Sequence, residues 1–270
     1  MAVVQALYYT DPLCPWSWAL EPTLRRLQCD LGQELRLTYV MSGMGNELQD
    51  PAQAALQALE ASQASGMPVD VRLWLRDPPT SSHPACIAVE AAGEQGDPGP
   101  YLRRLREAVM CRQHKLEGAE ELTAEARATP DLDLERFKLD IGSSAILEKL
   151  GADLERARSV SSRHHSSGPD RVKLPSLEFR GPDGEAHGVY GYSDYPALAA
   201  AAQAAGAQLD PGPAPSVCDA LRRFGTMSAA EVAAVCGLSG PAAATELWRL
   251  ATEWQARPER LGTAELWTRA

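Results

Sequence analysis

The sequence lacks the cysteine patterns through which thiols usually act in pairs. Its six cysteines include no C-x-x-C motif and no spacing typical of zinc ligands. It also lacks an uninterrupted apolar run of ~18 residues, the length that spans a bilayer, and its first residues lack the basic region of a signal peptide. We therefore expect a cytoplasmic protein with no membrane span, whose cysteines are mostly free and buried.

Positive charge is scarce as well. The chain has 26 Lys and Arg residues against 36 Asp and Glu residues, which gives a net charge of −10. An acidic chain repels phosphate backbones and anionic headgroups, so we expect neither nucleic acid nor a membrane as a partner. With 44% hydrophobic residues among 270, the chain can bury a sizeable core.

The first 41 residues predict a βαβ unit. Residues 2–10 and 35–41 have the composition and alternation of strands. Between them, leucines recur at helical spacing from residue 20 to residue 31, with Arg25 and Arg26 on the opposite, polar face. Gly32 ends this helix. A strand, a helix and a strand in this order predict parallel strands joined by a right-handed crossover.

A long helical stretch separates this unit from a second pair of strands. The expected helices lie at 51–64, 84–95, 100–115, 119–128 and 133–160. Strand patterns then return at 172–179 and 186–190, joined by a Gly-Pro-Asp-Gly turn at 181–184, and a helix follows at 195–205. This order predicts an α/β protein with a thioredoxin fold that carries an inserted helical domain.

The residues after 210 predict a small helical, winged-helix-like module. A Pro-rich linker is followed by helical segments at 216–225, 227–236 and 241–255, and Ser228 and Glu231 are spaced as a capping box. Residues 214–270 hold six arginines and six acidic residues, so we expect the module to contact protein and not DNA. The predicted domains are therefore a thioredoxin fold made of 1–48 and 168–209, a helical insert of 49–167, and a C-terminal module of 214–270.

The segment Asp11-Pro-Leu-Cys-Pro-Trp-Ser-Trp18 carries the candidate chemistry. Cys14 lies where the first strand ends and the first helix begins, so the helix dipole is expected to lower its pKa. Pro15 suits the first helical turn. Ser17 stands where an oxidoreductase needs a second thiol to release a mixed disulfide, and a hydroxyl can only hydrogen-bond the thiolate.

Residues 1–207 resemble the DsbA-like branch of the thioredoxin superfamily. Besides the Cys14 segment, the resemblance rests on segments 82–85, 103–108, 173–177 and 191–192. It implies that Pro175 follows a cis peptide bond, faces Cys14, and lies beside backbone that pairs with an extended substrate. The implied catalytic residues are Cys14, Ser17 and Pro175, and the implied substrate-binding residues are Pro15, Trp16 and Leu174.

Within that branch, the segment up to Pro22 is similar to the FrnE-like proteins and to the adaptors that deliver the Spx regulator to the ClpXP protease. Three functions remain open. The chain could carry out thiol–disulfide chemistry on protein or glutathione disulfides with a single cysteine, act as a non-catalytic adaptor that binds a protein partner, or be a glutathione-dependent isomerase or transferase of the kappa type. We expect no cofactor other than glutathione. We also expect no metal, since His164 and His165 lie in a polar loop that favours solvation.

Overall fold

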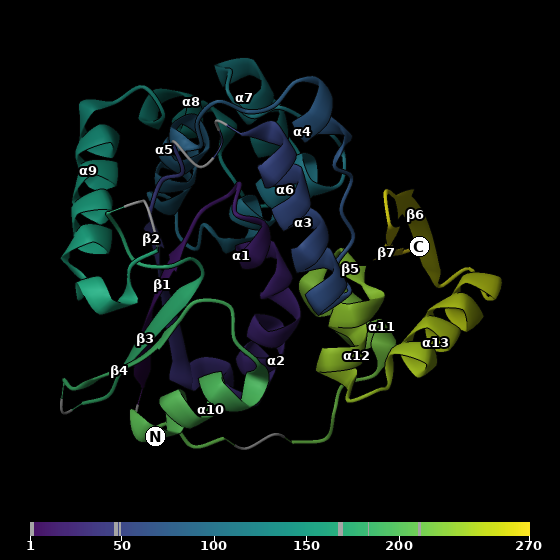
Figure 1. The fold of residues 1–270 in the computed structure, drawn as a ribbon. Coiled ribbons are helices and arrows are strands. Elements are labelled where there is room, and N and C mark those ends of the chain that lie inside the picture. The colour runs from purple at the N-terminus through teal and green to yellow at the C-terminus, as the bar shows by residue number, and fades with distance from the viewer. Residues whose placement is uncertain (1–2, 46–47, 49, 167–169, 183, 210–211) are drawn as a thin grey trace.

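The structure has a four-stranded sheet made from two distant parts of the chain (Figure 1). The computed structural model describes residues 3–45, 48, 50–166, 170–182, 184–209 and 212–270. Strand β1 (Val4–Thr10) pairs in parallel with β2 (Leu35–Met41) and antiparallel with β3 (Ser176–Arg180), which pairs antiparallel with β4 (Ala186–Tyr190). The order β2-β1-β3-β4 confirms the predicted α/β thioredoxin fold.

The third strand begins later than predicted. Strand character was expected from residue 172, but Val172 forms only an isolated bridge with His165 and β3 starts at Ser176. Pro175, which follows a cis bond from Leu174, has no N–H to donate to a ladder, and this limits the strand on its N-terminal side. Part of the expected turn at 181–184 lies outside the described residues, since residue 183 is not among them.

The first predicted helix is two helices. Helix α1 (Pro15–Ala19) ends at Leu20, and α2 (Glu21–Leu31) begins there with Pro22 in its first turn. Gly32 ends α2 at a φ of 51°, as predicted. Leucines of α2 and α10 (Tyr195–Ala204) pack on the sheet. Arg25, expected on the face opposite the leucines, is buried because it pairs with Glu231 of the C-terminal residues.

The helical insert covers the side of the sheet where β1 ends. Its helices are α3 (Pro51–Ser65), α4 (Arg72–Arg76), α5 (His83–Gly93), α6 (Gly99–Met110), α7 (Ala119–Arg127), α8 (Leu134–Asp140) and α9 (Ser144–Ser159). The stretch 133–160 was expected as one helix. It breaks before Ser143, whose hydroxyl accepts a hydrogen bond from the Ile146 N–H at 3.3 Å and so caps α9.

Short 3₁₀ helices, η1 (Gly32–Glu34) and η3 (Ser162–His164), lie in connections of this part of the chain. In η3 the His164 ring stacks on Tyr190, with 3.7 Å between centroids, and His165 Nδ1 lies 3.3 Å from Asp170 Oδ1. The described residues contain no group of three or more His, Cys, Asp or Glu side chains that could hold a metal ion. Their helices include none that is both long and apolar enough to cross a bilayer.

The C-terminal module contains strands as well as helices. Its elements are α11 (Val217–Phe224), β5 (Met227–Ser228), α12 (Ala229–Cys236), α13 (Gly240–Thr252), β6 (Ala256–Leu261) and β7 (Ala264–Arg269). The three strands form a separate sheet in the order β5-β7-β6. The predicted capping box of Ser228 and Glu231 is present at the start of α12. Sequence analysis missed the hairpin of β6 and β7.

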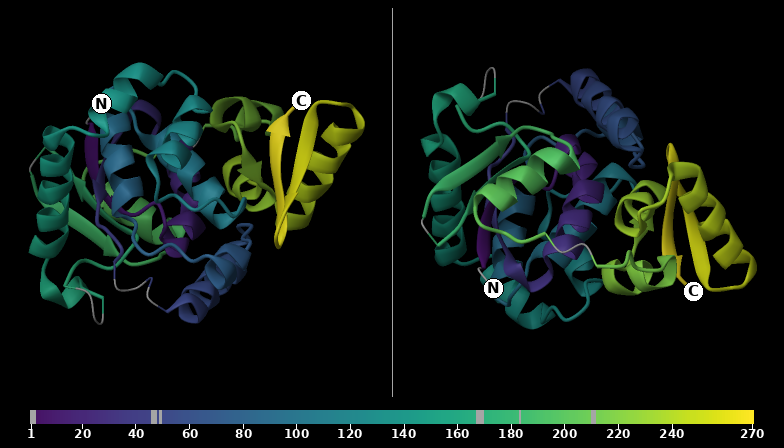
Figure 2. Two further views of the ribbon diagram at one scale, coloured as in Figure 1. Left: turned by 90° about the horizontal axis from the view of Figure 1, so that it is seen from above. Right: turned by 90° about the horizontal axis from the view of Figure 1, so that it is seen from below.

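The module lies against one side of the rest of the molecule (Figure 2). Helix α12 packs on α2, and the β6–β7 turn reaches the segment after α3, where the Thr263 N–H donates to the Val69 carbonyl at 3.1 Å. Thr263 Oγ1 accepts a hydrogen bond from the Val69 N–H at the same distance. The module therefore contacts the rest of the protein at two separate places.

A buried group of charges lies where α2, α6 and α12 meet, and we call it the ionic cluster. Its members are Glu21, Arg25, Arg103, Arg106, Glu107 and Glu231. Arg103 Nη1 lies 2.7 Å from Glu231 Oε1, and Arg25 Nε lies 3.1 Å from the same oxygen. Burial would raise the pKa of Glu21, but the cations of Arg106, Arg103 and Arg25 outweigh it and lower that pKa. The cluster thus joins the thioredoxin fold, the insert and the module.

Candidate functional site

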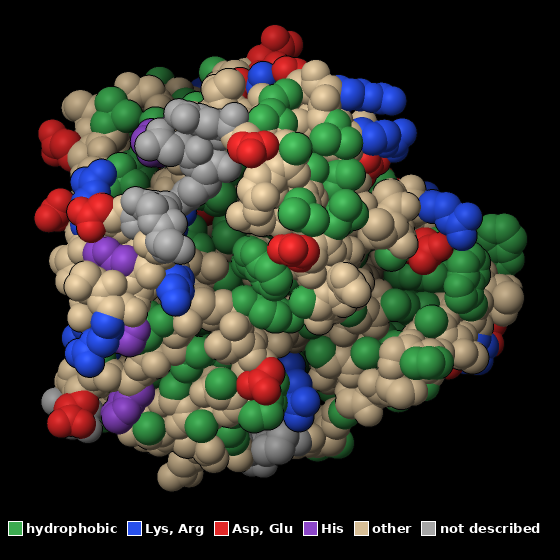
Figure 3. Space-filling model, in the orientation of Figure 1, with side chains coloured by type: hydrophobic (Ala, Val, Ile, Leu, Met, Phe, Trp, Pro, Cys, Tyr) green, Lys and Arg blue, Asp and Glu red, His purple; other side chains and the backbone are tan. Residues whose placement is uncertain are grey.

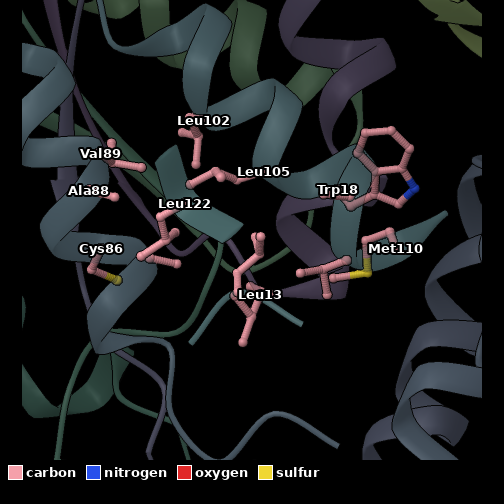
Figure 4. Packing of buried hydrophobic residues seen from close by; sticks show 14 of the residues in the cluster. Leu13, Trp18, Cys86, Ala88, Val89, Leu102, Leu105, Met110 and Leu122 are labelled. Atoms are coloured by element: carbon pink, nitrogen blue, oxygen red, sulfur yellow. The ribbon is translucent and has the colours of Figure 1, made fainter. Parts of the chain in front are cut away.

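Cys14 lies at the N-cap of α1, directly after β1, as predicted. Leu13 N–H donates to Asp11 Oδ1 at 2.8 Å, and the Leu13 side chain inserts among Leu102, Leu105 and Leu122 of the insert (Figure 4). The residues directly before the cysteine are therefore held in place by a hydrogen bond and by packing against the insert. Cys14 is only 4% exposed.

Burial raises the pKa of the Cys14 thiol. The side chain and the N–H of Ser17 act in the opposite direction, as does the charge of Arg171, whereas the charge of Asp11 adds to the rise. The lowered pKa expected from the helix start is wrong for this structure, because the insert removes the thiol from water. The sequence pattern around Cys14 could not show that the helical insert would bury the thiol.

Ser17 is fully buried beside Cys14. Its hydroxyl makes no hydrogen bond of regular geometry within the described chain, so its interaction with the thiol is the main polar contact left to it. The Tyr8 hydroxyl donates a long hydrogen bond of 3.5 Å to the Ser17 carbonyl. Ser17 can therefore favour a thiolate at Cys14 but cannot displace a partner from it.

A buried carboxylate that sequence analysis did not single out lies beneath the cysteine. Asp11 Oδ2 accepts hydrogen bonds from Ser82 Oγ at 2.6 Å and from Cys86 Sγ at 3.4 Å. Burial raises the pKa of Asp11 and raises that of Cys86 well above its ordinary value. Cys86 is therefore held as a neutral donor. In the sequence, the Asp-Pro pair before Cys14 was the feature from which a structural acid at this position could have been predicted.

The cis-proline turn lies at the same end of the sheet as Cys14. Tyr9 of β1 pairs with Ser176 of β3, so the residues after β1 and before β3 meet at one edge. Ser176 Oγ donates to the Lys173 carbonyl at 2.6 Å and accepts from the Gly191 N–H at 3.1 Å. This network links the turn to the loop after β4.

An aromatic pair connects that loop to α1. The rings of Trp16 and Tyr192 have centroids 5.2 Å apart and planes at 48°. Trp16 is half-buried and Tyr192 is 36% exposed, so the pair faces solvent in part. Leu174 is half-buried and packs on the hydrophobic core. In the sequence, Tyr192 belongs to a segment that was noted only because it resembles the family. The structure adds Tyr192 to the predicted site through its contact with Trp16. Pro15, by contrast, is buried in the first turn of α1.

Comparisons with known proteins agree with this geometry. A family model described as thioredoxin matches residues 7–165. The chain belongs to the thioredoxin family. Its sequence is similar to those of the SpxH proteins, and its fold is similar to those of solved disulfide isomerase and disulfide reductase structures.

The curated relatives of this thioredoxin-family chain are adapters. This chain is 29% identical over 164 residues to the ClpXP adapter protein SpxH of Halalkalibacterium halodurans. The match covers 56% of this chain and 53% of that protein. It is 30% identical over 159 residues to SpxH of Bacillus subtilis, with the same coverage. In these two matches the chain spans about half the length of the relative. A match to SpxH of Shouchella clausii, at 26% identity, covers 96% of this chain and 87% of that protein.

Solved structures show the same fold. A putative protein disulfide isomerase from Nitrosomonas europaea superimposes with a TM-score of 0.60 at 16% identity, covering 75% of this chain and 97% of that one. The cytosolic disulfide reductase DsbM from Pseudomonas aeruginosa gives 0.54 at 18% identity, covering 68% and 88%. At such identities the likeness concerns the fold and not the activity.

Proposed function

We propose that this chain is a cytoplasmic adaptor that binds a protein partner and presents it to a ClpXP-type protease. The observation that carries the proposal is the state of Cys14, which is almost wholly buried and has a raised pKa. Ser17 occupies the position from which a second thiol would release a substrate. These features disfavour rapid disulfide exchange and are compatible with binding. The adapter relatives point in the same direction.

The surface beside the site suits a protein partner. Helix α3 packs against α1 and exposes Leu56 and Leu59, and α4 exposes Leu75. Apolar side chains gather over the middle of this face, with most Lys and Arg side chains nearer its edges (Figure 3). We propose that a partner contacts these leucines together with Trp16 and the cis-proline turn at Pro175 and Leu174. Exposed apolar patches of this kind are typical of interaction sites.

A degradation assay tests the adaptor role. An Spx-type regulator and ClpXP from the source organism are combined with and without the chain, and loss of the regulator is followed over time. We expect the chain to accelerate degradation, Cys14→Ser to retain that effect, and Leu56→Asp to weaken partner binding about tenfold, because one buried interface leucine contributes roughly 1–2 kcal/mol. Leu139→Asp is the matched control, since Leu139 is 77% exposed on α8.

The second candidate is monothiol chemistry on protein or glutathione disulfides. It is favoured by the Ser17 hydroxyl and N–H, which both lower the pKa of Cys14 and so partly offset burial. Catalytic turnover with glutathione that is lost in Cys14→Ser, together with no effect on degradation, would support this candidate and overturn the adaptor proposal.

A further inference from the structure

Two cysteines outside the candidate site meet at the boundary between the thioredoxin fold and the module. Cys29 lies on α2 and packs against the hydrophobic cluster of the module, in which Cys236 is a buried member. The helices that carry them, α2 and α12, are in direct contact through the ion pair of Arg25 and Glu231. A disulfide needs Cα atoms within about 7 Å of each other. Cys29 and Cys236 pack in the same cluster and are near enough that the charge of Cys29 acts on the Cys236 thiol.

A pocket gives solvent access to one of these thiols. A cavity of about 400 Å³ is bordered by α2, the linker, α11 and α12, and its lining includes Cys29, Arg26, Arg223, Val235 and Gly237. Cys29 is half-buried, whereas Cys236, which lies between two lining residues, is 8% exposed. The two thiols therefore differ in access, and Cys29 is the one that a dissolved reagent reaches first.

We propose that Cys29 and Cys236 form a reversible disulfide that ties the C-terminal module to the thioredoxin fold under oxidising conditions. The oxidant is a small anionic disulfide of the glutathione class. Its carboxylates suit the guanidinium groups of Arg26 and Arg223, and its ammonium groups suit Asp30, which also lines the pocket and lies 3.6 Å from Arg26 Nε. Neither thiol is part of a disulfide in the structure.

The charges and burial around the two thiols determine which thiol attacks the oxidant first. Burial raises the pKa of Cys29, and the nearby Arg223 cation opposes that rise. Burial and then the negative charge of Cys29 raise the pKa of Cys236 to about 11. Once Cys29 is bound in a mixed disulfide its charge is gone, so one obstacle to ionising Cys236 is removed. Cys29 is thus the attacking thiol and Cys236 the resolving one.

The reaction balances in two exchanges. The Cys29 thiolate, formed by loss of a proton to water, attacks one sulfur of oxidised glutathione, whose S–S bond breaks to release a glutathione thiolate. Cys236 also loses its proton to water, and its thiolate then attacks Cys29 Sγ in the mixed disulfide and releases a second glutathione thiolate. Each released thiolate takes a proton from water. The two protein thiols are oxidised, and one glutathione disulfide is reduced to two thiols.

Mass spectrometry of the native full-length chain tests the proposal. The reduced protein is incubated with oxidised glutathione, quenched by acid and analysed without reductant. We expect wild type to lose the mass of two hydrogen atoms and to yield a crosslinked Cys29–Cys236 peptide. Cys236→Ser should instead gain one glutathionyl group at Cys29, and Cys29→Ser should form no crosslink. Cys218→Ser is the matched control in the same module and should behave as wild type.

The result for the wild-type protein tests the proposed Cys29–Cys236 disulfide without the variants. A mixed disulfide at Cys29 that never proceeds to a crosslink, or a crosslink that joins Cys218 or Cys14, would overturn the proposal. An unmodified Cys29 under conditions that modify Cys218 would do the same. Reversal of the crosslink by reduced glutathione is the final expected result, and its failure would refute reversibility.

Discussion

Neutralising Glu231 should loosen the module from the rest of the protein. This carboxylate is fully buried and lies within 3.1 Å of Arg25 Nε and Arg103 Nη2, while its Oε2 also accepts the Ser228 N–H at 2.7 Å. In the ionic cluster, three arginines face three glutamates, so their formal charges balance. Glu231→Gln keeps the shape of the side chain and leaves one positive charge uncompensated in a buried site.

The expected cost follows from that burial. Removing one partner of a buried ion pair costs about 3–5 kcal/mol, and we expect the lower end because glutamine still accepts one hydrogen bond. The control is Glu259→Gln, since Glu259 pairs with Arg112 at 2.9 Å but is about half exposed, with 48% of its side chain accessible. An exposed pair of this kind contributes about 0–1 kcal/mol.

Urea unfolding followed by tryptophan fluorescence measures the difference, and limited proteolysis of the linker at 212–215 reports undocking. Trp18 lies beneath the Arg103 guanidinium, 4.3 Å from it, and Trp267 lies in the core of the module, so both parts carry a probe. Equal losses of less than 1 kcal/mol in the two variants would refute the view that buried charges hold the module in place.

Three further predictions concern single side chains. Burial, together with the charge of Asp153 and a hydrogen bond to it, raises the pKa of Glu90 to about 8. The folded state therefore binds this proton more tightly than the unfolded state and loses stability as the pH rises from 4.5 toward 8. Above pH 8, Glu90→Gln should raise Tm by a few degrees, whereas below pH 4.5 it should leave Tm unchanged. Calorimetry that shows the same Tm shift at both pH values would contradict this. Limiting alkylation with peptide mapping should label the half-exposed Cys218 before Cys14, and the reverse order would show that Cys14 is accessible and activated. Ser17→Cys should gain dithiothreitol-driven insulin reduction that wild type lacks, and equal turnover without added monothiol would show that another cysteine resolves the adduct.

Local patterns predicted most of the elements, because each depends on neighbours in sequence. The βαβ unit, the Gly32 stop, the strand at 186–190 and the capping box at Ser228 and Glu231 were all correctly predicted. The β6–β7 hairpin was missed because its strands mix Arg, Glu and Pro258 with few β-branched residues.

Long-range features of the site could not be predicted in the same way. Burial of Cys14 depends on helices that follow tens of residues later, and the expected pKa therefore had the wrong direction. Leucine spacing placed Arg25 on the opposite face of its helix, but its burial could not be predicted because its partner, Glu231, lies in the C-terminal module. Periodicity identifies the apolar face of a helix but does not show where a buried charge will find its counter-charge.

The pairing of β1 with β3 has a consequence for synthesis on the ribosome. Tyr9 leaves the ribosome long before Ser176, its partner in the sheet, and the whole helical insert emerges between them. Until β3 arrives, β1 has β2 on one side and an unpaired edge on the other. Such an edge can pair with another chain. This edge of β1 therefore stays open to such pairing while about half of the chain is still being made.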